Sequence, residues 1–190
     1  MKTCILYMDG FAEFEIIIAV GNLASRGEVF PIALENRPYI SEEKQTFLPA
    51  GSPFELDPET VDVLLIPGGT GVTRLMESAR LKPWLRELDT RGVLIGAICG
   101  GVHLLGWAGL LSGRRFTCNA RGYELDEETS LKYFSEAEYV EQDVVVDRNI
   151  VTAMGQAFIE FGTEIADQAG LYATPEERAR DYRWIKNIAE

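Results

Sequence analysis

Apolar runs and amphipathic stretches alternate along the chain. Near-continuous apolar runs cover residues 3–8, 61–69 and 93–98, and such runs suit strands that are buried on both faces of a parallel sheet. Amphipathic stretches with helical spacing follow at residues 12–27 and 100–111. This order of strands and helices predicts an α/β fold with an open, mostly parallel sheet and helices on both faces.

The remaining segments continue this alternation of strands and helices. Pro31 places a strand at residues 28–34 at a sheet edge or a bulge, because proline lacks an amide hydrogen. Residues 35–60 are rich in Pro, Glu and Ser and predict an irregular excursion. Further strands are expected at residues 46–50, 114–119 and 140–154, the last with a turn at residues 147–149, and further helices at residues 79–92, 156–170 and 174–189.

Several helix ends carry capping residues. Gly27 follows the first helical stretch and is expected to end it. Thr174 and Pro175 are expected as the N-cap and the first residue of the C-terminal helix. That helix carries Tyr182 and Trp184, which we expect to cap the protein's own core, with docking on a partner as the alternative.

Composition narrows the classes of function. The chain has 190 residues, 46% of them hydrophobic, and a formal net charge of −12. These values predict one domain over residues 1–190. An acidic surface repels phosphate backbones and anionic lipid, so neither nucleic acid nor a membrane is expected as a partner. Asp9 interrupts the N-terminal apolar run, which is untypical of a signal peptide, and we expect a cytoplasmic protein.

The cysteines and the histidine are sparse. Cys4, Cys99 and Cys118 are widely spaced, which is no disulfide framework and suits a reducing compartment. The only histidine is His103, and no two cysteines are separated by two residues. Neither a metal site nor a cofactor is therefore expected.

Cys99 lies between a buried strand and a helix in the stretch LIGAICGGVHLLGWAGLL. A residue on so tight a turn can be held in a sparsely populated backbone conformation, with its side chain above the sheet, as in a nucleophile elbow. Gly100 and Gly101 leave room for the turn, and the helix N-terminus favours a thiolate. The alternative is a small buried residue that packs where strand meets helix.

The Pro-Gly-Gly turn at residues 67–69 ends the neighbouring strand. Glycine amides can point toward an anion because no side chain stands in the way. The amides of Gly68, Gly69 and Gly100 are therefore candidates for an oxyanion hole beside the thiol. A plain turn is the alternative.

Glu15 opens the first helix in the stretch DGFAEFE. Three isoleucines follow it, so we expect this carboxyl to face inward, whereas Glu13 is expected as an ordinary N-terminal charge. Burial beside a thiol raises the pKa of a carboxyl. A protonated Glu15 can then donate a hydrogen bond to a thiolate and act as a general acid or base.

These motifs resemble those of the ThiJ/PfpI family, in the glutamine amidotransferase-like superfamily. DGFAEFE, LLIPGG and GAICGGVHLLGWAGLLSGRRFTCN occur in this order. The resemblance implies a three-layer flavodoxin-like sandwich, usually a homodimer, and a reactive Cys99 hydrogen-bonded to Glu15. Family activities include glyoxalase or deglycase action on α-oxoaldehydes, isocyanide hydration, peptidase activity, chaperoning and oxidative-stress sensing, so the fold does not fix the reaction.

The sequence departs from the family at several positions. Gly100 stands where peptidase-like members carry a histidine, which makes proteolysis an unfavoured interpretation. Asn119 stands where many deglycase-like members carry a histidine; it cannot shuttle a proton but can orient a substrate oxygen. His103 is expected as a core or interface histidine, with a catalytic role as the alternative. Cys118 is expected as a buried strand residue, with a redox partnership with Cys99 as the alternative.

Two interpretations of function use this site, and a third, a scaffold or binding module, would use the C-terminal helix with Tyr182 and Trp184. In the first, the protein is an enzyme in which Cys99 attacks a small electrophilic carbonyl and Glu15 moves the proton. In the second, it is a non-catalytic oxidative-stress sensor or a chaperone-like protein that uses the same cysteine. The sequence does not separate them, because one site geometry serves both.

Overall fold

The central sheet of the computed structural model is mostly parallel. The structure describes residues 1–119 and 132–188, and within them this sheet has the strand order β2-β1-β5-β6-β10-β9. Its strands are β1 (Lys2–Leu6), β2 (Glu28–Ile32), β5 (Val63–Ile66), β6 (Leu94–Ile98), β9 (Val144–Asp147) and β10 (Ile150–Ala153). All neighbours pair in parallel except β9, which is antiparallel to β10.

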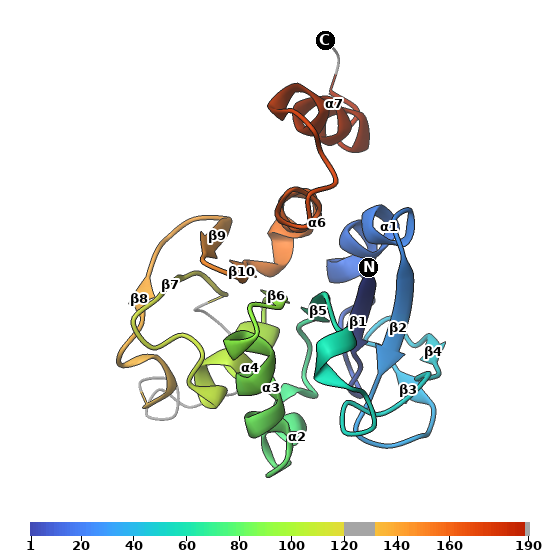
Figure 1. The fold of residues 1–190 in the computed structure, drawn as a ribbon, viewed down its shortest axis with the longest axis vertical. Helices are drawn as coiled ribbons and strands as arrows, with labels where there is room; N and C mark the ends of the chain where they lie inside the picture. Colours follow the sequence, from blue (N-terminus) through green and yellow to red (C-terminus); the bar gives the residue numbers. More distant parts are fainter. Residues whose placement is uncertain (120–131, 189–190) are drawn as a thin grey trace.

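Helices cover both faces of this sheet (Figure 1). On one side lie α1 (Ile17–Ala24) and α6 (Phe158–Gln168), with α7 (Pro175–Ile185) beyond α6. On the other lie α2 (Val72–Met76), α3 (Leu81–Thr90) and α4 (Gly101–Ala108). The expected three-layer α/β sandwich is confirmed. The sequence pattern missed α2, because five residues are too few to show helical periodicity.

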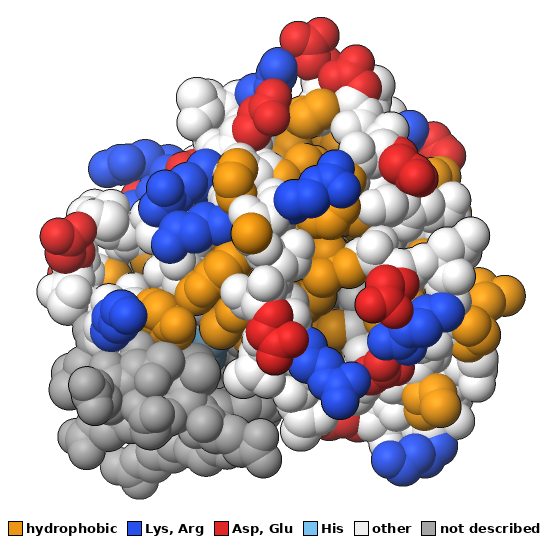
Figure 2. All heavy atoms as spheres, turned by 90° about the horizontal axis from the view of Figure 1, so that it is seen from below, with side chains coloured by type: hydrophobic (Ala, Val, Ile, Leu, Met, Phe, Trp, Pro, Cys, Tyr) orange, Lys and Arg blue, Asp and Glu red, His pale blue; other side chains and the backbone are white. Residues whose placement is uncertain are grey.

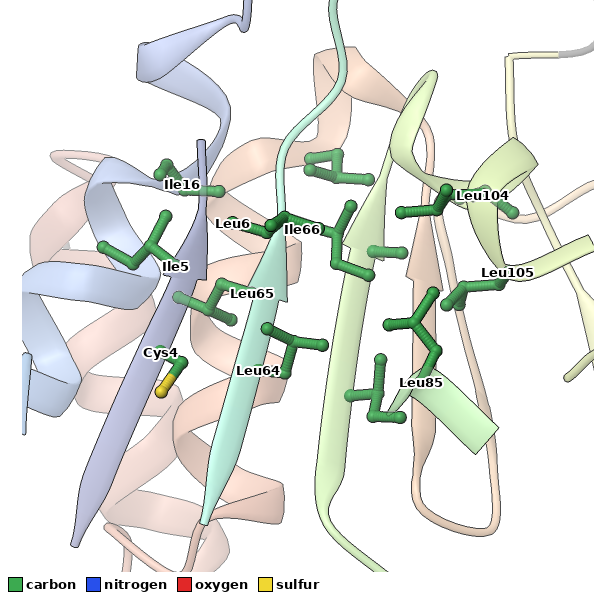
Figure 3. Packing of buried hydrophobic residues seen from close by; sticks show 14 of the residues in the cluster. Cys4, Ile5, Leu6, Ile16, Leu64, Leu65, Ile66, Leu85, Leu104 and Leu105 are labelled. Carbon is green, nitrogen blue, oxygen red and sulfur yellow. The ribbon is translucent and has the colours of Figure 1, made fainter. Parts of the chain in front are cut away.

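The core occupies the two spaces between the sheet and its helices. All four residues of β5 are buried, as expected for a strand covered on both faces. Figure 3 shows Leu64, Leu65 and Ile66 among the side chains of the neighbouring strand and of α4. Burying such a side chain stabilises the fold by roughly 1.5–3 kcal/mol relative to leaving it exposed.

Short elements make up the connections. A hairpin of β3 (Tyr39–Ile40) and β4 (Thr46–Phe47) lies within the irregular excursion. A second small sheet pairs β7 (Arg115–Phe116) in parallel with β8 (Glu138–Tyr139). Three-residue or four-residue 3₁₀ turns precede longer elements at η1 (Glu13–Ile16), η2 (Pro58–Thr60) and η3 (Gly155–Ala157).

The edge position of Pro31 is confirmed, because β2 is the outermost strand on its side of the sheet. The expectation for Gly27 is wrong. Helix α1 ends at Ala24, and Ser25 is its C-cap. Gly27 is required for another reason, since a Cβ atom there would lie 1.9 Å from the carbonyl oxygen of Met1. The glycine thus allows the chain to pass the start of β1.

The C-terminal helix does not cap the core, contrary to expectation. Thr174 is its N-cap and accepts a hydrogen bond from the Glu177 amide at 3.3 Å, as expected. However, α7 has no buried residue, and Trp184 is 79% exposed. The helix is attached to α6 through polar contacts, including an ion pair of Arg178 with Glu164.

The outer surface mixes charges of both signs. Figure 2 shows the face that carries α2 and α3, where Lys and Arg side chains stand among Asp and Glu side chains. This face is therefore not uniformly acidic despite the net charge of −12. Among the described residues, none of the helices has the length and apolar character that a membrane span requires.

Candidate active site

Four adjacent parallel strands end at one edge of the sheet. These strands are β1, β5, β6 and β10, and the carboxyl edge is where α/β folds usually bind ligands. The segments after the strands carry Glu15, Gly68, Cys99 and Gly155, in that order. The sequence pattern predicted the first three strand ends as parts of one site.

Cys99 occupies a strained turn between β6 and α4. Its φ angle is +56°, a left-handed conformation that costs a residue other than glycine about 1–2 kcal/mol. Its amide donates to the carbonyl of Ala153 on β10 at 2.9 Å, which fixes the turn against the neighbouring strand. Gly100, the next residue, is the N-cap of α4. The side chain of Cys99 is therefore held at the positive end of a helix, with 4% of the residue exposed.

Glu15 is buried beside this thiol. It lies in η1, with 3% of the residue exposed. Burial raises the pKa of Glu15 to about 7, while hydrogen bonds with the Cys99 side chain and the Gly68 amide act in the opposite direction. The Gly68 amide donates to Oε2 of Glu15 at 2.7 Å. Near neutral pH a large part of the Glu15 population is therefore protonated.

The backbones of Gly68 and Gly155 pack directly against this pair and form two walls of the site. A Cβ atom on Gly68 would lie 2.7 Å from Cβ of Cys99 and 2.7 Å from Oε2 of Glu15. A Cβ atom on Gly155 would lie 2.7 Å from Oε1 of Glu15 and 3.0 Å from Sγ of Cys99. Sequence reasoning missed Gly155. Its place immediately after the predicted strand 140–154 is the signal that could have found it.

Three backbone amides were predicted to form an oxyanion hole beside the thiol, and one of them already has a hydrogen-bond acceptor. The Gly68 amide is already engaged by Glu15. At the antiparallel bridge between Phe11 and Gly69, the Ala12 amide donates to the Gly68 carbonyl and the Thr70 amide donates to the Gly10 carbonyl, at 3.1 Å each. The Gly69 amide takes no part in this bridge. Gly100 stands at the start of α4, where the first amides have no partner within the helix. Gly69 and Gly100 therefore remain as candidate oxyanion donors.

Asn119 lies next to the Gly155 wall. Its side-chain oxygen accepts a hydrogen bond from the Gly155 amide at 2.6 Å, and its Nδ2 donates to Oε1 of Gln156 at 3.2 Å. The side chain therefore braces the η3 turn that covers Cys99 and Glu15. Contact with a substrate stays a prediction for Asn119.

The other candidate groups have different environments. His103 is buried, as expected, and burial lowers its pKa to about 4, so its ring is neutral at pH 7. The ring packs edge-on against Phe134 at a centroid distance of 5.4 Å. Burial raises the pKa values of Cys4 and Cys118 to about 11, so both remain thiols at neutral pH. All three cysteines are free of disulfide bonds.

A model of the DJ-1/PfpI family matches residues 1–168 of the chain. The chain belongs to the DJ-1/PfpI family. The resemblance inferred from the sequence motifs is thereby confirmed, and the matched range includes every strand of the central sheet and all the residues of the site. Helix α7 lies beyond it.

Similar proteins within this family bear several names. The chain is 29% identical over 156 residues to a deglycase, TK1284 of Thermococcus kodakarensis, with 80% of this chain and 89% of that protein covered. It is 27% identical over 158 residues to the glutathione-independent glyoxalase DJR-1.2 of Caenorhabditis elegans, covering 82% and 81%. The crystal structure of the DJ-1 superfamily protein Atu0886 from Agrobacterium tumefaciens matches all of both chains, with 27% identity and a TM-score of 0.83.

Proposed function

We propose that the protein is an enzyme that acts on small electrophilic carbonyl compounds, with α-oxoaldehydes such as methylglyoxal as first substrates. Cys99 is the nucleophile and Glu15 the proton carrier in this proposal. The observation that supports it most directly is the hydrogen-bonded, buried pair of Cys99 and Glu15, whose carboxyl has a pKa raised to about 7. The deglycase and glyoxalase names of the two relatives point to the same class of substrate.

The reaction begins with the addition of the Cys99 thiolate to the aldehyde carbon. A bond forms between sulfur and carbon, and the carbonyl electron pair moves onto oxygen, which becomes an oxyanion. The amides of Gly69 and Gly100 stabilise this charge, and Glu15 then supplies the proton that gives a hemithioacetal.

The same carboxyl completes the reaction. As a carboxylate, Glu15 removes the proton from the former aldehyde carbon, which leaves an enediolate. The hydroxyl proton passes to the other oxygen, and Glu15 returns its proton to the neighbouring carbon, which gives a thioester. Water then hydrolyses the thioester and regenerates the thiol. One α-oxoaldehyde and one water yield one α-hydroxy acid, so the reaction needs no external oxidant or reductant.

The experiment follows methylglyoxal loss and lactate formation by NMR. We expect turnover in the natural protein, none in Cys99→Ala, and a decrease of roughly 10²- to 10⁴-fold in Glu15→Gln, the range for loss of general acid–base catalysis. Cys118→Ser is the matched control and should retain turnover, because its thiol has a pKa raised to about 11. Turnover that survives in Cys99→Ala would contradict the proposal.

The second candidate function is an oxidative-stress sensor that uses the same sulfur. The thiolate of Cys99 would attack one oxygen of hydrogen peroxide and form a sulfenic acid as the O–O bond breaks, and the leaving hydroxide would take a proton from Glu15 and depart as water. Glu15 would then hold the oxidised sulfur by a hydrogen bond. Its distinguishing result is a peroxide-dependent mass gain confined to Cys99 without turnover of carbonyl compounds. A homodimer is proposed on family likeness alone, and analytical ultracentrifugation tests it.

A further inference from the structure

An acidic segment lies against the residues that carry Glu15. The β3–β4 hairpin binds the chain after β1 through backbone bonds, from Gly10 N–H to Ile40 O at 2.7 Å and from Glu42 N–H to Phe11 O at 2.9 Å. Phe11 in turn forms the bridge with Gly69. The turn of this hairpin is therefore linked through Phe11 to Gly69, a proposed oxyanion donor.

Carboxylates cluster at this contact. The Glu13 amide donates to Oε2 of Glu43 at 3.4 Å, and Oε1 of Glu13 accepts a hydrogen bond from the side chain of Gln45. Glu42 and Glu43 are exposed to solvent. The negative charges of both reach Glu15, since each adds to the rise of its pKa. Their field therefore acts on the group that contacts the thiol.

The basic side chains at this sheet edge, which include Arg74 near Asp9, offset these carboxylates only in part. Arg37 is paired with Asp9 at 2.6 Å and with Glu35 at 2.9 Å. Lys44 follows Glu42 and Glu43 in the hairpin turn and is exposed, so these three residues together keep one net negative charge. An electrophile that carries a carboxylate would be repelled by the negative charges of this region as it approaches. The oxyanion formed on attack would give the bound electrophile a second negative charge.

We propose that Glu13, Glu42 and Glu43 select electrophiles at Cys99 by charge. The substrates are then small carbonyl compounds without a negative charge, and 2-oxo acids such as glyoxylate are excluded. The inference rests on the proposed function, since it takes Cys99 as the nucleophile, and it adds the substrate class. Each carboxylate of this cluster is expected to change the rate for an anion by roughly threefold to tenfold.

The test compares two alkylating reagents that differ in charge. Iodoacetamide is neutral and iodoacetate is anionic, and with both the thiolate displaces iodide as the sulfur–carbon bond forms. Rates at Cys99 are measured by peptide mass spectrometry at low salt. The ratio of the two rates cancels any change in the thiolate population, because both reagents consume the same thiolate. Cys99 in urea-unfolded protein is the reference thiol.

We expect the folded protein to favour iodoacetamide over iodoacetate at least tenfold more than the unfolded protein does. The exposed double substitution Glu42→Gln/Glu43→Gln should reduce this preference at least fivefold, and 1 M KCl should reduce it as well. Glu28→Gln, which removes one negative charge, is the control for position, because Glu28 is an exposed residue at the opposite end of the parallel strands. It changes the net charge of the whole protein and should leave the ratio unchanged.

The outcomes separate the two proposals. Equal reagent ratios for folded and unfolded protein, or an equal effect of Glu28→Gln, would overturn the charge selection and leave the proposed function standing. Charge selection without turnover of methylglyoxal would support the inference and contradict the enzyme. A Cys99 that reacts with neither reagent would overturn both. If turnover is observed, the preference in kcat/KM for methylglyoxal over glyoxylate should fall in the double variant.

Discussion

The site edge of the sheet and the C-terminal helix are built by opposite means. At the site, four strand ends bring Glu15 and Cys99 together, with less than a tenth of either residue exposed. The backbone of two glycines packs directly against both side chains. Helix α7 has no buried residue and is attached to α6 by ion pairs and polar hydrogen bonds. At the site, close packing fixes the positions of the side chains, and an added methyl group has no room. On α7, by contrast, we expect side chains to be replaced with little effect on the fold.

Among changes to the packing of the site, the largest effect is expected from Gly155→Ala. The added methyl group would lie 2.7 Å from Oε1 of Glu15 and 3.0 Å from Sγ of Cys99, so one of the two must move. A displacement of about 1 Å in a catalytic group can cost about 10²-fold in rate. We expect a loss of this size in Cys99 alkylation and in any turnover, measured with the protein still folded by circular dichroism.

Gly21→Ala is the control for that substitution. Gly21 lies in α1, and a Cβ atom there has no heavy atom within 4 Å. Alanine is favoured over glycine in a helix by roughly 1 kcal/mol, so stability should rise slightly and Cys99 reactivity should stay the same. Similar behaviour of the two variants would show that the Gly155 wall is not required.

The raised pKa of Glu15 predicts a pH dependence of stability. Because its pKa rises from 4.5 when unfolded to about 7 when folded, the folded state holds this proton more tightly. Its contribution to stability is fully present below pH 4.5 and is lost as pH rises through 7. The unfolding free energy of the natural protein minus that of Glu15→Gln should therefore fall by about 3 kcal/mol between pH 4 and pH 8.

The difference between the two proteins is needed because His103 acts with the opposite sign. Its pKa is lowered from 6.5 to about 4, so its contribution is lost as pH falls. This contribution is common to both proteins and cancels in the difference, which chemical denaturation at each pH measures. A difference that is flat across this range would mean that Glu15 is not protonated in the folded protein at neutral pH.

At the α6–α7 contact the expected effects are smaller. Arg178 pairs with Glu164 and, at 3.3 Å, with Asp167, and its side chain is 40% exposed. Exposed pairs are worth about 0–1 kcal/mol, so Arg178→Ala should lower the unfolding free energy by about 1 kcal/mol or less, and less still in 0.5 M NaCl. Arg180→Ala on the same helix is the control. A loss of several kcal/mol in Arg178→Ala would make α7 part of the cooperative core.

The sequence predicted the site better than it predicted the C-terminal helix, for physical reasons. A buried parallel strand followed by Cys99, Gly100 and Gly101 is a local pattern, and parallel strands must bring their ends to one edge. The contribution of Gly155 depends on which strand lies beside β6, which no local periodicity contains.

The error for α7 has the opposite origin. Tyr182 and Trp184 suggested an apolar face, but the tyrosine hydroxyl instead donates to Oε1 of Glu160 on α6 at 2.7 Å. Lys186 pairs with the same carboxylate. An aromatic residue with a polar end can serve a core or a polar contact, and only the partner helix decides between them. The charge on α6 that decides it belongs to Glu160, 22 residues before Tyr182 and therefore outside the periodicity of α7 itself.

Two tryptophans give the sharpest form of the comparison, and Trp184 gives its smallest effect. Trp84 on α3 is 6% exposed, whereas Trp184 on α7 is 79% exposed. Trp84→Ala should lower the unfolding free energy by about 3–5 kcal/mol, and Trp184→Ala by less than about 0.5 kcal/mol. Urea denaturation followed by circular dichroism measures both. If Trp184→Ala instead destabilises the protein in a way that depends on protein concentration, Trp184 is buried against another chain in solution and α7 is an interface instead of a free surface.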